Sequence, residues 1–165
     1  MRRIGDTYYL VYADSSRGRP TSLGYATATH PLGPFSYRGV IIDNIESDPK
    51  AWNNHGSIER VGDRWYVFYH RPSRRSVLHR RLCIEPIEIL DDGSIPEVLM
   101  TSQGAGEPYG PGEVIEAWRA CAVRGGAYLE PDGEGAERLA GLVAGAEAVF
   151  RYVASEHGFA LITLV

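Results

Sequence analysis

Residues 5–12 read GDTYYLVY and residues 62–69 read GDRWYVFY, and this repeated pattern decides how the rest of the chain is interpreted. In both copies a Gly-Asp pair, typical of a tight turn, precedes a run of aromatic and β-branched residues. Such runs favour β-strands because these side chains pack well on a pleated sheet. The repeat therefore predicts two equivalent structural units, each entered through a turn and a strand.

Two further strand-like segments follow each copy of the repeat. They are LGYATATH (23–30) and SYRGVIID (36–43) after the first copy, and RRLCIEPIEIL (80–90) and SIPEVLM (94–100) after the second. Sheets of three or four strands that recur along a chain are typical of β-propeller blades, and a β-sandwich of short hairpins is the alternative. We therefore predict an all-β chain in which residues 1–100 form a partial β-propeller of about two blades.

Two blades alone would leave sheet edges and apolar faces uncovered, whereas propellers close with about four to eight blades. A strand begins directly after Met1, and the last residues, FALITLV (159–165), again resemble a strand, so both ends look interrupted. We therefore expect the chain to be part of a longer protein. Self-association through the open propeller edges is the alternative.

Residues 101–113, TSQGAGEPYGPGE, are rich in Gly and Pro and predict a linker. A glycine-rich phosphate-binding loop is a weak alternative, because prolines interrupt the segment and no clear helix follows. Strand-like segments around a turn then open a second region, residues 114–165. Within it, residues 137–154 fit a helical spacing of apolar side chains, although Gly141 and Gly145 weaken a helix.

The composition argues against several classes of function. The 165 residues carry a net charge of −4 and have a pI near 5.7, which gives no general affinity for nucleic-acid phosphates. No apolar run reaches the roughly 18 residues that a membrane-spanning helix needs. Arginines are frequent in residues 71–81, but the aromatic residues that an RNA site would interleave with them lie in the preceding strand. We predict neither a nucleic-acid nor a membrane partner.

The segment WNNHGSIERVGDRWYVFYHR (52–71), together with RRLCIEPI (80–87), resembles glycoside hydrolase family 43. Members of this family are five-bladed β-propeller enzymes that act on arabinose- and xylose-containing glycans. The upstream copy of the repeat is similar to the preceding blade, so the resemblance covers about residues 1–100. The second region looks similar to the start of an accessory β-sandwich of the carbohydrate-binding-module type. This favours a partial β-sandwich there, with strands rather than a helix across 137–154.

The resemblance also implies a sugar-binding site. In the family, the histidine matched by His55 faces a central channel and commonly contributes to a calcium or water cluster beneath the sugar, and the arginine matched by Arg80 reaches the sugar. A guanidinium suits hydroxyl pairs, whereas calcium prefers oxygen ligands, so a direct histidine–calcium bond would be unusual. We expect His55, Arg80 and Asn54 to bind substrate, with no required cofactor and a structural calcium at His55 as an option. The simpler interpretations are a capped turn at His55 and a surface charge at Arg80.

The resemblance places the catalytic groups outside this sequence. The family uses a base, a modulator and an acid, and inverting hydrolysis needs the acid and the base on opposite sides of the scissile bond. The base and modulator belong to blades that this sequence lacks, and the acid corresponds to a position just before Met1. We therefore assign no catalytic residue and expect a C-terminal part of a glycoside hydrolase that is inactive by itself. A non-catalytic sugar-binding module and a propeller-derived interaction protein are the alternatives.

Overall fold

The computed structural model describes residues 1–45, 54–134 and 136–153, and their secondary structure is β-strand apart from one 3₁₀ turn, Ala117–Arg119. The strands are β1 (Arg2–Ile4), β2 (Thr7–Asp14), β3 (Ser22–Ala28), β4 (Ser36–Ile42), β5 (Gly56–Val61), β6 (Arg64–Ser73), β7 (Ser76–Ile87), β8 (Ala122–Arg124), β9 (Tyr128–Pro131), β10 (Glu137–Ala140) and β11 (Glu147–Val149). The described ranges contain no helix that is long and apolar enough to cross a bilayer. The prediction of an all-β chain is confirmed.

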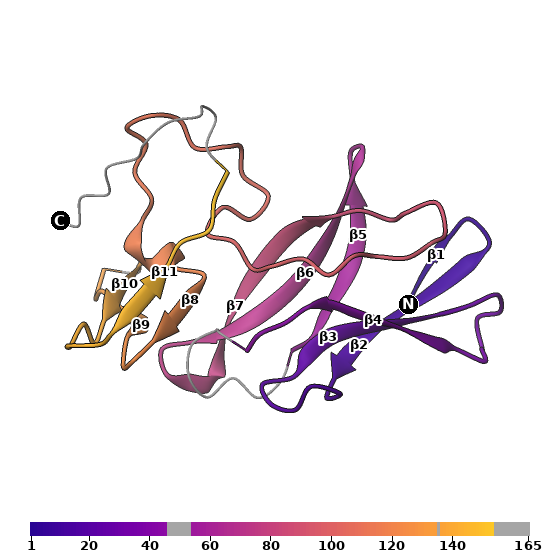
Figure 1. The fold of residues 1–165 in the computed structure, drawn as a ribbon, viewed down its shortest axis with the longest axis horizontal. Coiled ribbons are helices and arrows are strands. Elements are labelled where there is room, and N and C mark those ends of the chain that lie inside the picture. Colours follow the sequence, from indigo (N-terminus) through magenta and orange to yellow (C-terminus); the bar gives the residue numbers. More distant parts are fainter. Residues whose placement is uncertain (46–53, 135, 154–165) are drawn as a thin grey trace.

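The two copies of the repeat open two separate antiparallel sheets. The first sheet has the order β1-β2-β3-β4 and the second the order β5-β6-β7. Figure 1 shows β1–β4 at one end of the molecule, β5–β7 in the middle and β8–β11 at the other end. Gly5 and Gly62 open the two Gly-Asp turns with φ of +57° and +61°, a backbone region that glycine enters without steric cost. The predicted pair of blade-like units, a partial propeller, is confirmed.

The predicted strand over residues 94–100 is wrong. In this segment only Val98 makes a β-bridge, and it is a parallel bridge to β4 of the first sheet. The cause is a pair of long-range hydrogen bonds: the hydroxyl groups of Tyr9 and Tyr25 bind the backbone of residues 93–95, each at 2.8 Å. These contacts hold the segment against the first sheet, so it cannot extend the second.

The main hydrophobic core lies between the two sheets. Its fully buried side chains include Leu23 and Tyr25 from the first sheet and Val67 and Tyr69 from the second. Gly56 permits the close approach of the sheets, because an added Cβ would lie 2.8 Å from Leu23 Cδ2 and even closer to a backbone oxygen of β6. Any larger residue would disturb both the pairing of β5 with β6 and its packing against the first sheet.

The C-terminal strands form two small antiparallel pairs, β8 with β11 and β9 with β10. The stretch 137–153 therefore contains strands and no helix, as the resemblance favoured. The division into a linker at 101–113 and an accessory sandwich at 114–165 stays a prediction. The strand predicted for 159–165 lies outside the described residues.

A buried arginine joins these C-terminal strands to the second sheet. Arg71 of β6 is only 5% exposed, and its guanidinium donates hydrogen bonds to the carbonyl oxygens of Ala120 and, at 2.8 Å, of Cys121. Arg81 of β7 adds a hydrogen bond to the carbonyl of Trp118 at 2.7 Å. The five donors of a planar guanidinium suit such paired carbonyl acceptors.

We predict that Arg71→Met lowers the free energy of unfolding by about 2–5 kcal/mol, because two buried carbonyl groups lose their donors. Urea denaturation measures the loss, and limited proteolysis reports release of the β8–β11 strands. Arg60→Met is the control, since Arg60 has only an exposed ion pair with Asp63 and should change stability by less than ~0.5 kcal/mol. Equal effects of the two substitutions would contradict the proposed anchoring.

Candidate functional site

The register of the β5–β6 hairpin brings two histidines together. Gly56 lies opposite Tyr69, so continuing the register by one residue places His55 opposite His70. The backbone N–H of His55 donates a hydrogen bond to Nε2 of His70 at 3.1 Å. The two rings meet edge to face, with centroids 5.4 Å apart and an interplanar angle of 74°. The backbone of His55 is thus fixed by the side chain of His70.

Both histidine positions and Arg80 belong to the face of the second sheet that points away from the main core. Val67, Tyr69 and Arg71 are buried on the core face. Because side chains alternate along a strand, His70 points to the other face. Arg80 lies opposite Pro72, two residues beyond His70 and on the same side of the sheet, and it is exposed. The structure therefore brings His55, His70 and Arg80 into one neighbourhood.

The electrostatics of His70 reflect this neighbourhood. Partial burial, the positive charge of Arg80 and the proximity of His55 together lower the pKa of His70 to about 4, and burial has the largest effect. His70 is therefore neutral at ordinary pH, and its Nε2 keeps the lone pair that accepts the His55 N–H. Its Nδ1 is buried and has no hydrogen-bond partner among the residues that the structure describes.

Asn54, the third residue expected to bind substrate, is buried, whereas His55 is exposed. Its exposed fraction is 0%, and its backbone N–H donates to Thr21 Oγ1 at 2.8 Å. Neither side-chain polar atom of Asn54 has a partner in the described part of the chain. Asn54 therefore ties the start of β5 to the residue before β3.

The donors that the structure describes around His55 do not fit calcium. Calcium takes about six to eight oxygen ligands, usually with carboxylates among them. The described residues contain no cluster of three or more His, Cys, Asp or Glu side chains that could hold a metal ion. Among the described residues, imidazole nitrogens and amides are the groups that lie near His55. A calcium ion would need oxygen ligands in addition to these groups.

His70 was missed as a site residue, although its signal is in the sequence. The pair Gly62–Asp63 forms a two-residue hairpin loop, with Val61 opposite Arg64. Such a loop fixes the register of both strands. Counting outward from the turn pairs His55 with His70, so the pattern identifies the second histidine without a structure.

The buried carboxylates are engaged in structural hydrogen bonds. Glu85 is 2% exposed and accepts hydrogen bonds from the N–H and Oγ1 of Thr101, each at 2.7 Å. Burial raises the pKa of Glu85, although the bonds from Thr101 oppose the shift. Asp14 accepts from Ser16 and Tyr37, and these bonds, against the opposing effect of burial, lower its pKa. Neither carboxylate lies on the face that carries His55.

Comparison with known proteins assigns the chain to one family. The sequence profile described as "Glycosyl hydrolases family 43" matches residues 1–95. A xylosidase/arabinosidase of Thermoclostridium stercorarium is 40% identical over 133 residues, which cover 73% of this chain and 28% of that enzyme. The chain therefore spans little more than a quarter of that relative's length.

Solved structures agree with this assignment. The crystal structure of a family 43 arabinoxylan arabinofuranohydrolase from Bacillus subtilis, in complex with cellotetraose, has a TM-score of 0.54 and 29% identity, covering 70% of this chain and 27% of that one. A β-xylosidase/α-arabinofuranosidase from a compost metagenome, crystallised with xylotriose in a calcium-free form, has a TM-score of 0.51 and 34% identity, covering 60% of this chain and 28% of that one. The resemblance seen in the sequence motifs is confirmed, and the chain belongs to glycoside hydrolase family 43.

Proposed function

We propose that this chain supplies one wall of the sugar-binding site in a family 43 glycoside hydrolase that acts on xylose- or arabinose-containing glycans. The observation that carries the proposal is the convergence of His55, His70 and Arg80 on the face of the second sheet that points away from the main core. The imidazole of His55, whose backbone His70 fixes, can exchange hydrogen bonds with sugar hydroxyls, and the guanidinium of Arg80 can donate to a pair of hydroxyls. The relatives' activities on xylosides and arabinosides support the choice of glycan.

In this proposal the chain positions the sugar and does not perform the proton transfers. Inverting glycosidases need two carboxyl groups about 6.5–9.5 Å apart across the bond that is cleaved. The buried carboxylates Asp14 and Glu85 hold the fold together through hydrogen bonds and do not face His55. The acid and the base would come from the remainder of the enzyme, and calcium has no role in the proposal.

A chimera tests the proposal directly. We expect a Thermoclostridium stercorarium xylosidase/arabinosidase whose homologous region is exchanged for this chain to hydrolyse aryl xylosides or arabinofuranosides. His55→Ala and Arg80→Ala in the chimera should each lower kcat/KM by about 10–100-fold, because each variant loses one or two hydrogen bonds to the sugar. The isolated chain should show no turnover above background.

His79→Ala is the matched control, because His79 is exposed and adjacent to Arg80 on β7. It should change kcat/KM by less than about twofold. Thermal unfolding of each chimera separates lost activity from lost stability. Equal losses for His55→Ala and His79→Ala would show that His55 is a surface residue with no part in binding.

The pKa of His70 gives a pH dependence of stability. The pKa is about 4 in the folded chain against an ordinary value of 6.5, so between these values the unfolded chain binds more protons. The free energy of unfolding should therefore fall as the pH drops from about 6.5 to about 4. We expect His70→Gln, whose amide oxygen can still accept the His55 N–H but does not titrate, to flatten this slope.

Urea denaturation at several pH values between 4 and 7 measures the slope. His30→Gln is the control, since His30 is an exposed loop histidine away from the site. The control should keep the slope of the unmodified chain. An unchanged slope in His70→Gln would mean that the imidazole is not held neutral by its surroundings.

A second proposal follows from the exposed edge of the second sheet: we propose that the isolated chain associates with a second copy through β7. In the described part of the chain β7 is an edge strand, and its Leu78 and Leu82 are 85% and 73% exposed. Exposed edges with apolar side chains favour pairing with another sheet. A propeller-derived interaction protein would rely on the same surface.

Sedimentation velocity over a wide concentration range should detect this association, and the thermal midpoint should rise with concentration. We expect Leu82→Lys to give a monomer at all concentrations. Leu142→Lys, at a 63% exposed position in the C-terminal strands, should leave the association unchanged. A chain that is monomeric at every concentration would rule out the second proposal and leave the first intact.

A further inference from the structure

A groove of about 800 Å³ lies at the end of the second sheet opposite to His55. It is formed where β6 begins, at Arg64, and where β7 ends, at Ile87, together with the residues that follow β7. His70 lies six residues further along β6, about 20 Å away at 3.3 Å per residue. The groove is therefore separate from the site described above.

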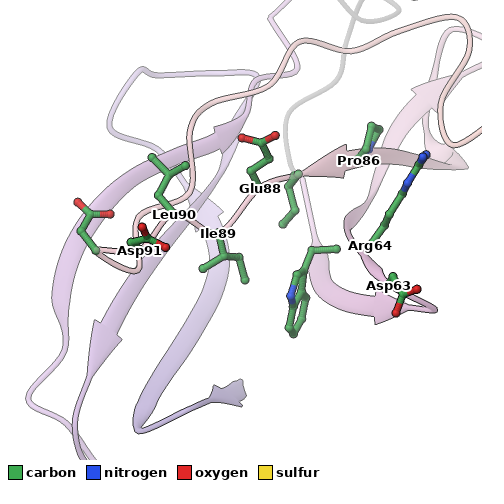
Figure 2. Close-up of a pocket in the computed structure, with 10 residues that line it drawn as sticks. Asp63, Arg64, Pro86, Glu88, Ile89, Leu90 and Asp91 are labelled. Atoms are coloured by element: carbon green, nitrogen blue, oxygen red, sulfur yellow. The ribbon is translucent and has the colours of Figure 1, made fainter.

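The lining combines an aromatic floor with charged walls. Trp65 and Ile89 are both half-buried and pack against the edge of the main core, so part of each side chain remains accessible. Figure 2 shows Arg64 and Asp63 on one side of the groove and Leu90 and Asp91 on the other, with Ile89 between them. A ligand in the groove would touch apolar surface below and polar groups on both sides.

Three of the charged side chains are available to a ligand. Asp63 is paired with Arg60, and Asp92 accepts hydrogen bonds from Ser94. By contrast, Arg64, Glu88 and Asp91 are exposed and form no hydrogen bond or ion pair with any described residue. The groove thus offers two free acceptor groups and one free donor group around an indole.

We propose that this groove binds a short xylose- or arabinose-containing oligosaccharide, as a second carbohydrate site distinct from the wall at His55. Sugar rings have apolar C–H faces that pack on aromatic rings, and hydroxyl groups that donate to carboxylates and accept from guanidinium groups. The volume suits a small oligosaccharide. The choice of glycan rests on the proposed function, whereas the proposal that the groove binds a sugar does not depend on it.

A metal ion explains the lining less well. Glu88 and Asp91 are exposed carboxylates, and the described residues include no cluster of three metal-binding side chains. An indole and an isoleucine contribute nothing to the binding of a hard cation, which prefers oxygen ligands. A sugar uses every class of side chain that lines the groove.

Titration of the full 165-residue chain with xylotriose, followed by tryptophan fluorescence and by NMR, tests the proposal. We expect saturable binding that the double variant Glu88→Ala/Asp91→Ala weakens at least tenfold. Trp65→Phe, which keeps an aromatic ring against the core, should weaken binding and reduce the fluorescence change. The control Glu107→Ala removes an exposed carboxylate from residues 101–113 and should leave the affinity unchanged.

The outcomes separate this inference from the proposed function. Binding that survives the double variant but is lost in His55→Ala or Arg80→Ala would place the sugar at the first site and overturn the second. If xylotriose does not bind although the chimera is active, the groove is not a sugar site and the proposed function stands. If xylotriose does not bind but calcium chloride binds saturably, and the double variant abolishes that binding, the groove is a cation site instead.

Discussion

The turn at Gly62–Asp63 allows one register between β5 and β6, and the organisation of the second sheet depends on it. With Val61 opposite Arg64, the side chains of Val67, Tyr69 and Arg71 enter the core. A slip of one residue would send all of them to the opposite face and bring the neighbouring side chains inward. The same register sets His55 against His70, so packing and the candidate site are fixed by a single hairpin.

The two faces of the second sheet have different roles. The core face is covered by the first sheet and, through Arg71, by the C-terminal strands. The other face carries His70 and Arg80 beside exposed Leu82. The chain spans little more than a quarter of the length of these relatives, so in the proposed function the groups opposite this face come from the rest of the enzyme.

The sequence was sufficient for the features that local patterns encode. The repeated Gly-Asp strands predicted two sheets, and the hairpin register could have identified His70. The strand predicted for residues 94–100 is wrong because the hydroxyl groups of Tyr9 and Tyr25, far away in the sequence, hold that segment on the first sheet. The burial of Asn54 depends on Thr21 in another sheet, which no pattern around Asn54 reveals. Long-range hydrogen bonds of this kind leave no local pattern in the sequence, so they could not be predicted from it.

The distribution of carboxylates is the reason that the proposed function assigns binding and bond cleavage to different parts of the enzyme. Glu85 and Asp14 are buried and engaged in hydrogen bonds within the fold, so they are not exposed to a substrate. The free carboxylates Glu88 and Asp91 lie at the far end of the sheet from His55. An acid and a base must sit on opposite sides of one bond. Glu59 lies on the same face of β5 as His55, but it is ion-paired with Arg2. The described residues therefore offer no such pair of free carboxylates around His55 and Arg80, and for this reason the proposed function gives the chain a binding role and leaves proton transfer to the rest of the enzyme.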